Sequence, residues 1–260
     1  MLVATLNVWA RHGDWPSRRA RLAAGFAALG PDLVALQETT VLGPVDQAAE
    51  IMGDAYHLAH SRRRSADGMG ISIASRWPLL DVQELRLEGS EPDDGFPCTT
   101  LIATVDPPEL DDVVRFVNYF PSWAPSQEFE RERQAVRVAQ QLASLTGHVV
   151  IAGDFDADPD AASMRYWTGH QSLDGTSVCY RDAWASCHPA APGHTFVPDN
   201  PHSADWDWPY RRIDYLLVRC ASHGGPTLQI AGCQRTFDQP DTVASDHYGL
   251  IADLIPPNTA

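Results

Sequence analysis

The chain has 260 residues, 44% of them hydrophobic and eight of them tryptophan, which supplies a large core and excludes a mainly disordered protein. Its 34 acidic residues outnumber 19 basic residues and give a formal charge of −15, whereas proteins that coat long nucleic acids usually carry the opposite sign. The sequence has no run of 18 apolar residues and no secretory signal pattern at its N-terminus, so we expect a cytoplasmic protein without a spanning helix.

Short apolar runs bounded by turn residues predict most of the secondary structure. In chain order, strands are expected at residues 2–8, 33–36, 71–74, 101–105, 113–119, 148–152, 213–219 and 250–254. A helix is expected at 18–29, where Gly30-Pro31 stops it, and a longer helix at 126–145. Strands outnumber helices, which favours packed sheets flanked by helices, and the lack of linkers or repeats predicts a single domain over residues 1–260.

Polar and ionisable side chains recur where the expected strands begin or end. In chain order these residues are Asn7, Glu38, Asp154, Asp156, Asp214, Asp246 and His247. A carboxylate at the mouth of a strand is unfavourable for a core and useful in a site. Their recurrence predicts that several strand ends converge on one polar pocket.

The same residues belong to six short motifs that follow one another along the chain. They are Thr5-Leu-Asn7, Leu36-Gln-Glu38, Gly70-Ile-Ser-Ile-Ala-Ser75, Gly153-Asp-Phe-Asp156, Arg212-Ile-Asp214-Tyr and Ser245-Asp-His247. Together they resemble, in order and spacing, the motifs of the deoxyribonuclease-I-like endonuclease/exonuclease/phosphatase superfamily. The resemblance implies a four-layer α/β sandwich, in which two mostly antiparallel sheets pack face to face between outer helices and the active site lies at one end.

The resemblance also implies a metal-dependent enzyme that hydrolyses a phosphate mono- or diester by in-line attack of water on phosphorus. It makes Glu38 the principal metal ligand, with Asn7 beside it as ligand or phosphate contact and Asp246 adding charge. An oxygen-rich site of this kind suits Mg²⁺ or Mn²⁺ better than zinc. The five cysteines include no Cys-x-x-Cys spacing, so they predict neither a zinc site nor a disulfide framework.

Three further residues receive catalytic roles from the resemblance. Asp154 would position or deprotonate the attacking water, and His247 would bind or protonate a phosphate oxygen. Asp214 would hold the imidazole in one tautomer, and a carboxylate partner of this kind raises the imidazole pKa.

Two positions depart from the family pattern. Asp156 stands where the family usually has Asn, so it would recruit a second metal ion, repel a dianionic phosphate or simply begin a helix. Tyr119 stands near the place where many members have a His, and it is either a phosphate contact with a catalytic role or a core aromatic. The identity of the general acid therefore stays open.

The substrate is the least determined part of this interpretation. We expect Asn118, Arg212 and Arg62 to bind substrate, and the acidic charge favours a small soluble phosphate ester over duplex DNA. A DNA or RNA nuclease of the same superfamily is the alternative. A catalytically degenerate binding domain and a hydrolase of non-phosphate bonds also remain, and nothing in the sequence indicates a membrane or a protein partner.

Overall fold

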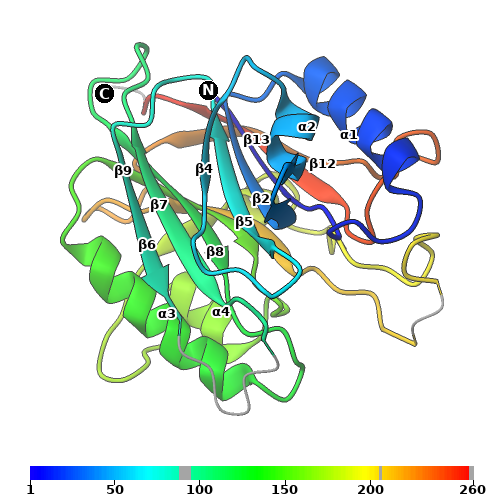
Figure 1. The fold of residues 1–260 in the computed structure, drawn as a ribbon. Coiled ribbons are helices and arrows are strands. Elements are labelled where there is room, and N and C mark those ends of the chain that lie inside the picture. Colours follow the sequence, from blue (N-terminus) through cyan, green and yellow to red (C-terminus); the bar gives the residue numbers. More distant parts are fainter. Residues whose placement is uncertain (88–94, 205–206, 258–260) are drawn as a thin grey trace.

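Two β-sheets form the centre of the structure, a computed structural model that describes residues 1–87, 95–204 and 207–257 (Figure 1). The first sheet contains β1 (Leu2–Asn7), β2 (Leu33–Leu42), β3 (Val45–Asp46), β4 (His57–His60), β5 (Met69–Ser75), β12 (Gln229–Thr236) and β13 (Gly249–Ile255). The second contains β6 (Asp81–Arg86), β7 (Thr99–Val105), β8 (Val114–Phe120), β9 (His148–Asp154), β10 (Tyr180–Asp182) and β11 (Asp214–Arg219). The helices are α1 (Trp15–Leu29), α2 (Gln47–Met52), α3 (Glu128–Ala143), α4 (Ala162–Trp167) and α5 (Ala183–Cys187).

Both sheets are mostly antiparallel, as the sequence predicted. Their strand orders are β12-β13-β1-β2-β5-β4 and β10-β11-β9-β8-β7-β6, with β3 paired to β2. Only two of these pairings, β1 with β2 and β8 with β9, are parallel. Because α1 joins the first parallel pair and α3 joins the second, each sheet contains one β-α-β unit.

Three clusters of buried apolar side chains separate four layers. One cluster lies between the two sheets, one between the first sheet and α1 and α2, and one between the second sheet and α3 and α4. Examples, in that order, are Leu33 and Phe116, Leu36 and Phe26, and Val117 and Val138. The predicted four-layer sandwich is therefore confirmed. In the described part of the chain, no helix is both long and apolar enough to cross a bilayer.

The expected strands and both expected helices are present, with bounds that differ by a few residues. Helix α1 begins earlier than expected, because Asp14 accepts a hydrogen bond from the amide of Ser17, and it ends at Gly30, whose φ is 60°. Helix α3 begins at Glu128, two residues after the expected Ser126. The unpredicted strands are short or half-exposed, like the edge strands β4, β6, β10 and β12, and lack a continuous apolar run.

The two β-α-β units bring their strand ends together. Asn7 is the last residue of β1 and Asp154 is the last residue of β9. The side-chain amide of Asn7 donates a hydrogen bond of 3.0 Å to Asp154 Oδ2, which joins the two sheets at this end. Carboxyl ends of parallel strands are a common place for a ligand site in α/β proteins.

Candidate active site

A cavity of about 510 Å³ lies beyond these strand ends. Part of its wall, the acidic lining, consists of Glu38, Asp154, Asp156 and Asp246, and His247 lies among them. Another part, the aromatic lining, consists of Trp9, Phe96, Trp123, Phe196 and Trp208. A hollow of about 520 Å³ on the outer face of α3 has no buried carboxylate in its lining. The first cavity is therefore the candidate active site.

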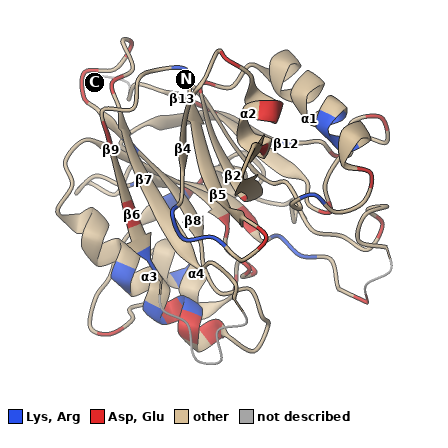
Figure 2. Ribbon diagram, in the orientation of Figure 1, with Lys and Arg blue, Asp and Glu red and all other residues tan. Residues whose placement is uncertain are grey.

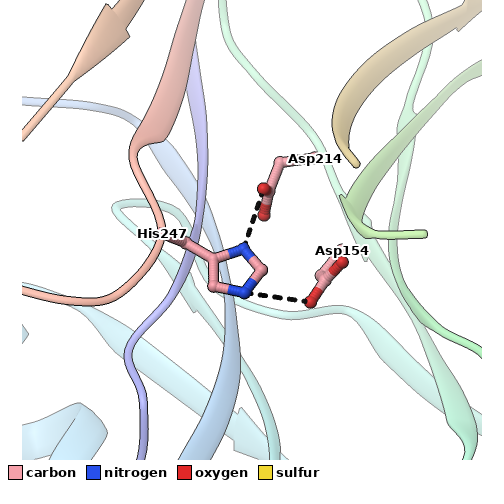
Figure 3. Close-up of side chains that lie close together, drawn as sticks. All are labelled: Asp154, Asp214 and His247. Carbon is pink, nitrogen blue, oxygen red and sulfur yellow. Dashed lines mark hydrogen bonds and ion pairs between the residues drawn. The ribbon is translucent and has the colours of Figure 1, made fainter. Parts of the chain in front are cut away.

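His247 lies between two buried carboxylates (Figure 3). Its Nδ1 is 3.0 Å from Asp214 Oδ2, and its Nε2 is 3.8 Å from Asp154 Oδ2. Burial alone would lower the pKa of His247, but the charges of Asp214, Asp154 and Asp246 outweigh burial and raise that pKa well above its ordinary value. An imidazolium in this position donates a hydrogen bond through Nδ1 and directs its Nε2–H group toward Asp154.

Asp214 is placed by its strand pairing. It is fully buried at the start of β11 and lies directly opposite Asp154 of β9. Its backbone amide donates to Thr195 Oγ1 at 3.2 Å, a contact that the sequence did not reveal. Its Oδ2 accepts from His247, whereas no described group hydrogen-bonds to its Oδ1.

Glu38 reaches the cavity because of a break in strand pairing. The register of β2 with β5 shifts between Leu36 and Thr39, and Glu38 has a φ of 55°. A bulge of this kind redirects a side chain, and left-handed backbone at a non-glycine residue is typical of functional sites. Burial raises the pKa of Glu38 to about 7, with the nearby charge of Asp246 as the second cause.

Asn7 connects the acidic lining through its side-chain amide. Its Nδ2 donates to Glu38 Oε1 and to Asp154 Oδ2, each at 3.0 Å, while its Oδ1 accepts from the amide of Trp9 at 3.0 Å. Asn7 thus presents N–H groups to the carboxylates and directs its oxygen toward the backbone. Burial also raises the pKa of Asp154, to about 6.

Asp156 also enters the cavity from a left-handed backbone position. Its φ is 51°, and its amide donates to Asp154 Oδ1 at 3.1 Å. Burial, followed by repulsion from Asp154, raises the pKa of Asp156 well above its ordinary value. Burial therefore favours the protonated form of Asp156, and a protonated carboxyl group can donate a hydrogen bond.

The chemistry of these donors suits a hard divalent cation. The carboxylates of Glu38 and Asp246 lie close enough together for the charge of Asp246 to raise the pKa of Glu38, and a cation between them would offset that repulsion. Asp154, Asp214 and His247 form a second possible set, since one ligand atom from each lies within 4.8 Å of the others. In that set, however, both imidazole nitrogens already face carboxylate oxygens.

Two residues expected to bind substrate are basic residues that the structure places outside the cavity lining. Arg212 pairs with Asp182 at 2.6 Å, with both side chains buried. Arg62 lies on the surface with its side chain 91% exposed, 3.6 Å from Glu84. Neither residue is in the cavity lining, whereas Arg211, one residue before Arg212, lines the cavity and donates to the backbone oxygen of Asp156 at 2.9 Å.

Asn118, which was also expected to bind substrate, lies fully buried between the two sheets. Its Nδ2 donates to the backbone oxygens of Leu36 and Ser72, and its Oδ1 accepts from Gln37 Nε2 at 2.8 Å. We expect Asn118→Ala to lower the free energy of unfolding by about 3 kcal/mol, because three buried partners lose a hydrogen bond. Urea denaturation measures this change, and a loss below about 1 kcal/mol would contradict it.

Tyr119 lies on the other face of the same strand, as a buried core aromatic. Successive side chains of a strand alternate between its faces, so Tyr119 points away from Asn118 into the layer under α3 and α4, with its ring 4.8 Å from that of Phe155. Its buried hydroxyl has no hydrogen-bond partner among the described residues. Tyr119→Phe should therefore leave stability unchanged or raise it by about 1 kcal/mol. A clear loss of stability in urea denaturation would count against this placement.

Arg18 is a buried residue of the site region that motif reasoning missed. Its guanidinium donates to the backbone oxygens of Ala244, His12, Ala10 and Val8, so it ties the loop after β1 to the segment before Asp246. Burial lowers its pKa to about 10, which leaves it charged at neutrality. The sequence could have indicated that Arg18 is buried, because the buried residues of α1 recur every three or four positions and Arg18 is one of them.

Comparison with known proteins agrees with this geometry. The family model described as "Endonuclease/Exonuclease/phosphatase family" matches residues 4–247. No curated protein matches the chain. Similar solved structures include an endonuclease/exonuclease/phosphatase from Bacteroides vulgatus (TM-score 0.75, 17% identity, 98% of each chain) and the human Nocturnin catalytic domain with bound sulfate (0.76, 16%, 99% of this chain and 93% of that one). A third is D. rerio TDP2 with a single-strand DNA product (0.71, 20%, 97% of each chain). At these identities the likeness establishes the fold.

Proposed function

Because the chain belongs to the endonuclease/exonuclease/phosphatase family, we propose that it is a metal-dependent phosphoesterase that hydrolyses a small, soluble phosphate ester by in-line attack of water. One observation carries the proposal: His247 lies between Asp214 and Asp154 in the same cavity as Glu38 and Asp246. This cavity combines a proton donor, a proton acceptor and hard oxygen ligands, which are the groups that hydrolysis of a phosphate ester requires.

Glu38 and Asp246 are the residues that would hold Mg²⁺ or Mn²⁺. A cation bound there would neutralise charge on the phosphate oxygens. Asn7 orients Glu38 and Asp154 through its two amide hydrogen bonds. The set of Asp154, Asp214 and His247 suits proton transfer better, because a metal ion on His247 would have to displace a proton that carboxylates hold in place.

The geometry of these residues supports a role for each of them in moving protons. Asp154 accepts a proton from the attacking water as the water oxygen bonds to phosphorus. The bond from phosphorus to the ester oxygen breaks on the opposite side, where solvent protonates the departing alcohol. His247 donates a hydrogen bond through Nε2 to a non-bridging phosphate oxygen. Asp214 keeps Nδ1 protonated and orients the ring. Asp156, whose pKa burial raises, donates a hydrogen bond to the phosphate in its protonated form, as an Asn side chain would at that position.

Hydrolysis of phosphate esters by the purified protein tests this function. The panel contains a chromogenic monoester, a chromogenic diester and plasmid DNA, each with Mg²⁺, Mn²⁺ or EDTA. We expect EDTA-sensitive turnover of a small ester that His247→Ala abolishes. Absence of turnover with every metal ion would refute the proposal and favour a non-catalytic binding domain, whereas a preference for plasmid DNA would favour the nuclease alternative.

Substitutions of Asp156 test whether its side chain acts as a hydrogen-bond donor or as a charged group. We expect Asp156→Asn to keep kcat/KM within about tenfold of the native value, because the amide also donates, and Asp156→Ala to lower it by at least about 100-fold. Native activity should fall as the pH rises and Asp156 ionises, and Asp156→Asn should lose that fall. Steady-state kinetics from pH 6 to 10 measure both effects, and equal losses in the two variants would show that Asp156 is not a donor.

A further inference from the structure

Resting on the proposed phosphoesterase, we infer that the substrate is a small ester with one phosphate group and one flat ring. The cavity of about 510 Å³ has a size typical of sites for small molecules. Its wall includes the acidic lining, where the phosphate reacts, and the aromatic lining, which is available to the rest of the substrate. The chemistry of the aromatic lining therefore identifies that second part.

The aromatic lining consists of large rings contributed by separate segments of the chain. Trp9 follows β1, Trp123 follows β8, and Phe196 and Trp208 lie between α5 and β11. Trp123 is 40% exposed. Rings of this kind attract another flat ring by offset or edge-to-face stacking, which discriminates a planar group from an aliphatic one.

Two sets of contacts place the aromatic lining next to the reacting end. The ring of Phe196 lies 5.0 Å from the ring of His247, and it meets Trp208 edge-on at 6.1 Å. Arg211 lies 5.6 Å from the ring of Trp208 and donates to the backbone of Asp156. A ring joined by a short linker to a phosphate at His247 therefore lies within reach of Phe196 and Trp208.

The charge of the cavity limits the substrate to one phosphate group. Among the described lining residues, Arg211 is the one Lys or Arg, and it already pairs with Asp158 at 3.1 Å. The chain contains no lysine. Figure 2 shows arginines on α1, on the loop after β4 and on α3, among other segments. A polynucleotide carries one negative charge per phosphate and binds several cations together, whereas one paired arginine is found among the described residues that line this cavity.

Three esters with primary alkyl leaving groups test the ring preference: ethyl, 2-cyclohexylethyl and 2-phenylethyl phosphate. Their similar leaving-group chemistry makes kcat/KM report binding of the organic part. Released phosphate is measured with Mg²⁺. We expect 2-phenylethyl phosphate to exceed ethyl phosphate by at least about tenfold, and to exceed the equally bulky cyclohexyl ester by about threefold or more.

Two variants assign the preference to the aromatic lining. Trp208→Leu should lower kcat/KM for 2-phenylethyl phosphate at least fivefold more than for ethyl phosphate. Tyr210→Leu is the matched control, since Tyr210 lies on the same segment, 49% exposed and outside the cavity lining, and it should change neither value.

The outcomes separate the ring preference from the phosphoesterase itself. Equal kcat/KM for the three esters overturns the ring preference while leaving the phosphoesterase intact. A higher kcat/KM for a short single-stranded DNA oligonucleotide overturns the limit of one phosphate. Failure to hydrolyse these esters and every member of the earlier panel overturns the phosphoesterase.

Discussion

Replacing His247 by Ala is expected to lower kcat for phosphate-ester hydrolysis by about 10³-fold or more while the protein stays folded. Two functions are lost together: the positive charge beside the phosphate and the proton donor at Nε2, each worth about 10²–10³-fold in comparable sites. The loss should appear in kcat more than in KM, because both interactions strengthen as charge develops on the phosphate oxygens. Single-turnover and steady-state kinetics with saturating Mg²⁺ measure it.

Two further variants make this result specific to the geometry. Asp214→Asn removes the carboxylate that holds Nδ1–H at 3.0 Å, so it should reproduce much of the His247→Ala loss. His57→Ala changes an exposed histidine on the edge strand β4 and should leave kcat unaltered. Turnover of His247→Ala within tenfold of the native rate would show that the imidazole has no part in the reaction.

Several polar residues of the site could be predicted from sequence because they lie at the ends of predictable strands. Asn7, Asp154 and Asp214 lie at the ends of strands with apolar interiors, and such runs identify both the strand and the polar residue that breaks it. The structure then brings Asn7 and Asp154 together across the two sheets, and the antiparallel pairing of β11 with β9 places Asp214 opposite Asp154. Their mutual hydrogen bonds depend on sheet packing, which no local pattern contains.

The substrate residues could not be predicted, because neighbouring positions of an extended chain face opposite ways. Arg211 lines the cavity whereas Arg212 pairs with Asp182 in the interior, and the sequence treats the two as equivalent cations. Asn118 and Tyr119 show the same effect on β8, where alternation directs one toward the facing sheet and the other toward α3. Exposure of Arg62 depends on the path of a loop, which composition does not determine.

Glu38→Gln is expected to weaken metal binding and catalysis but to stabilise the metal-free protein, and this combination identifies a metal ligand. The substitution removes the carboxylate charge but keeps an oxygen that can accept from Asn7 Nδ2. The affinity for Mn²⁺ should fall at least about tenfold, and kcat should fall at least about 100-fold, because a neutral amide is a poorer ligand for a hard cation. Calorimetric titration of Mn²⁺ and steady-state kinetics measure these losses.

The stability of the metal-free protein should change in the opposite direction. The pKa of Glu38 is raised from an ordinary 4.5 to about 7, so the folded state binds this proton more tightly than the unfolded state does. Burial of the ionised form therefore destabilises the native protein above pH 7, and the cost disappears as the pH falls toward 4.5. Metal-free Glu38→Gln should accordingly melt at a higher temperature than the native protein at pH 8, and the difference should shrink by pH 5. A merely structural Glu38 would lose stability on substitution at both pH values, and that result would remove the residue from the proposed metal site.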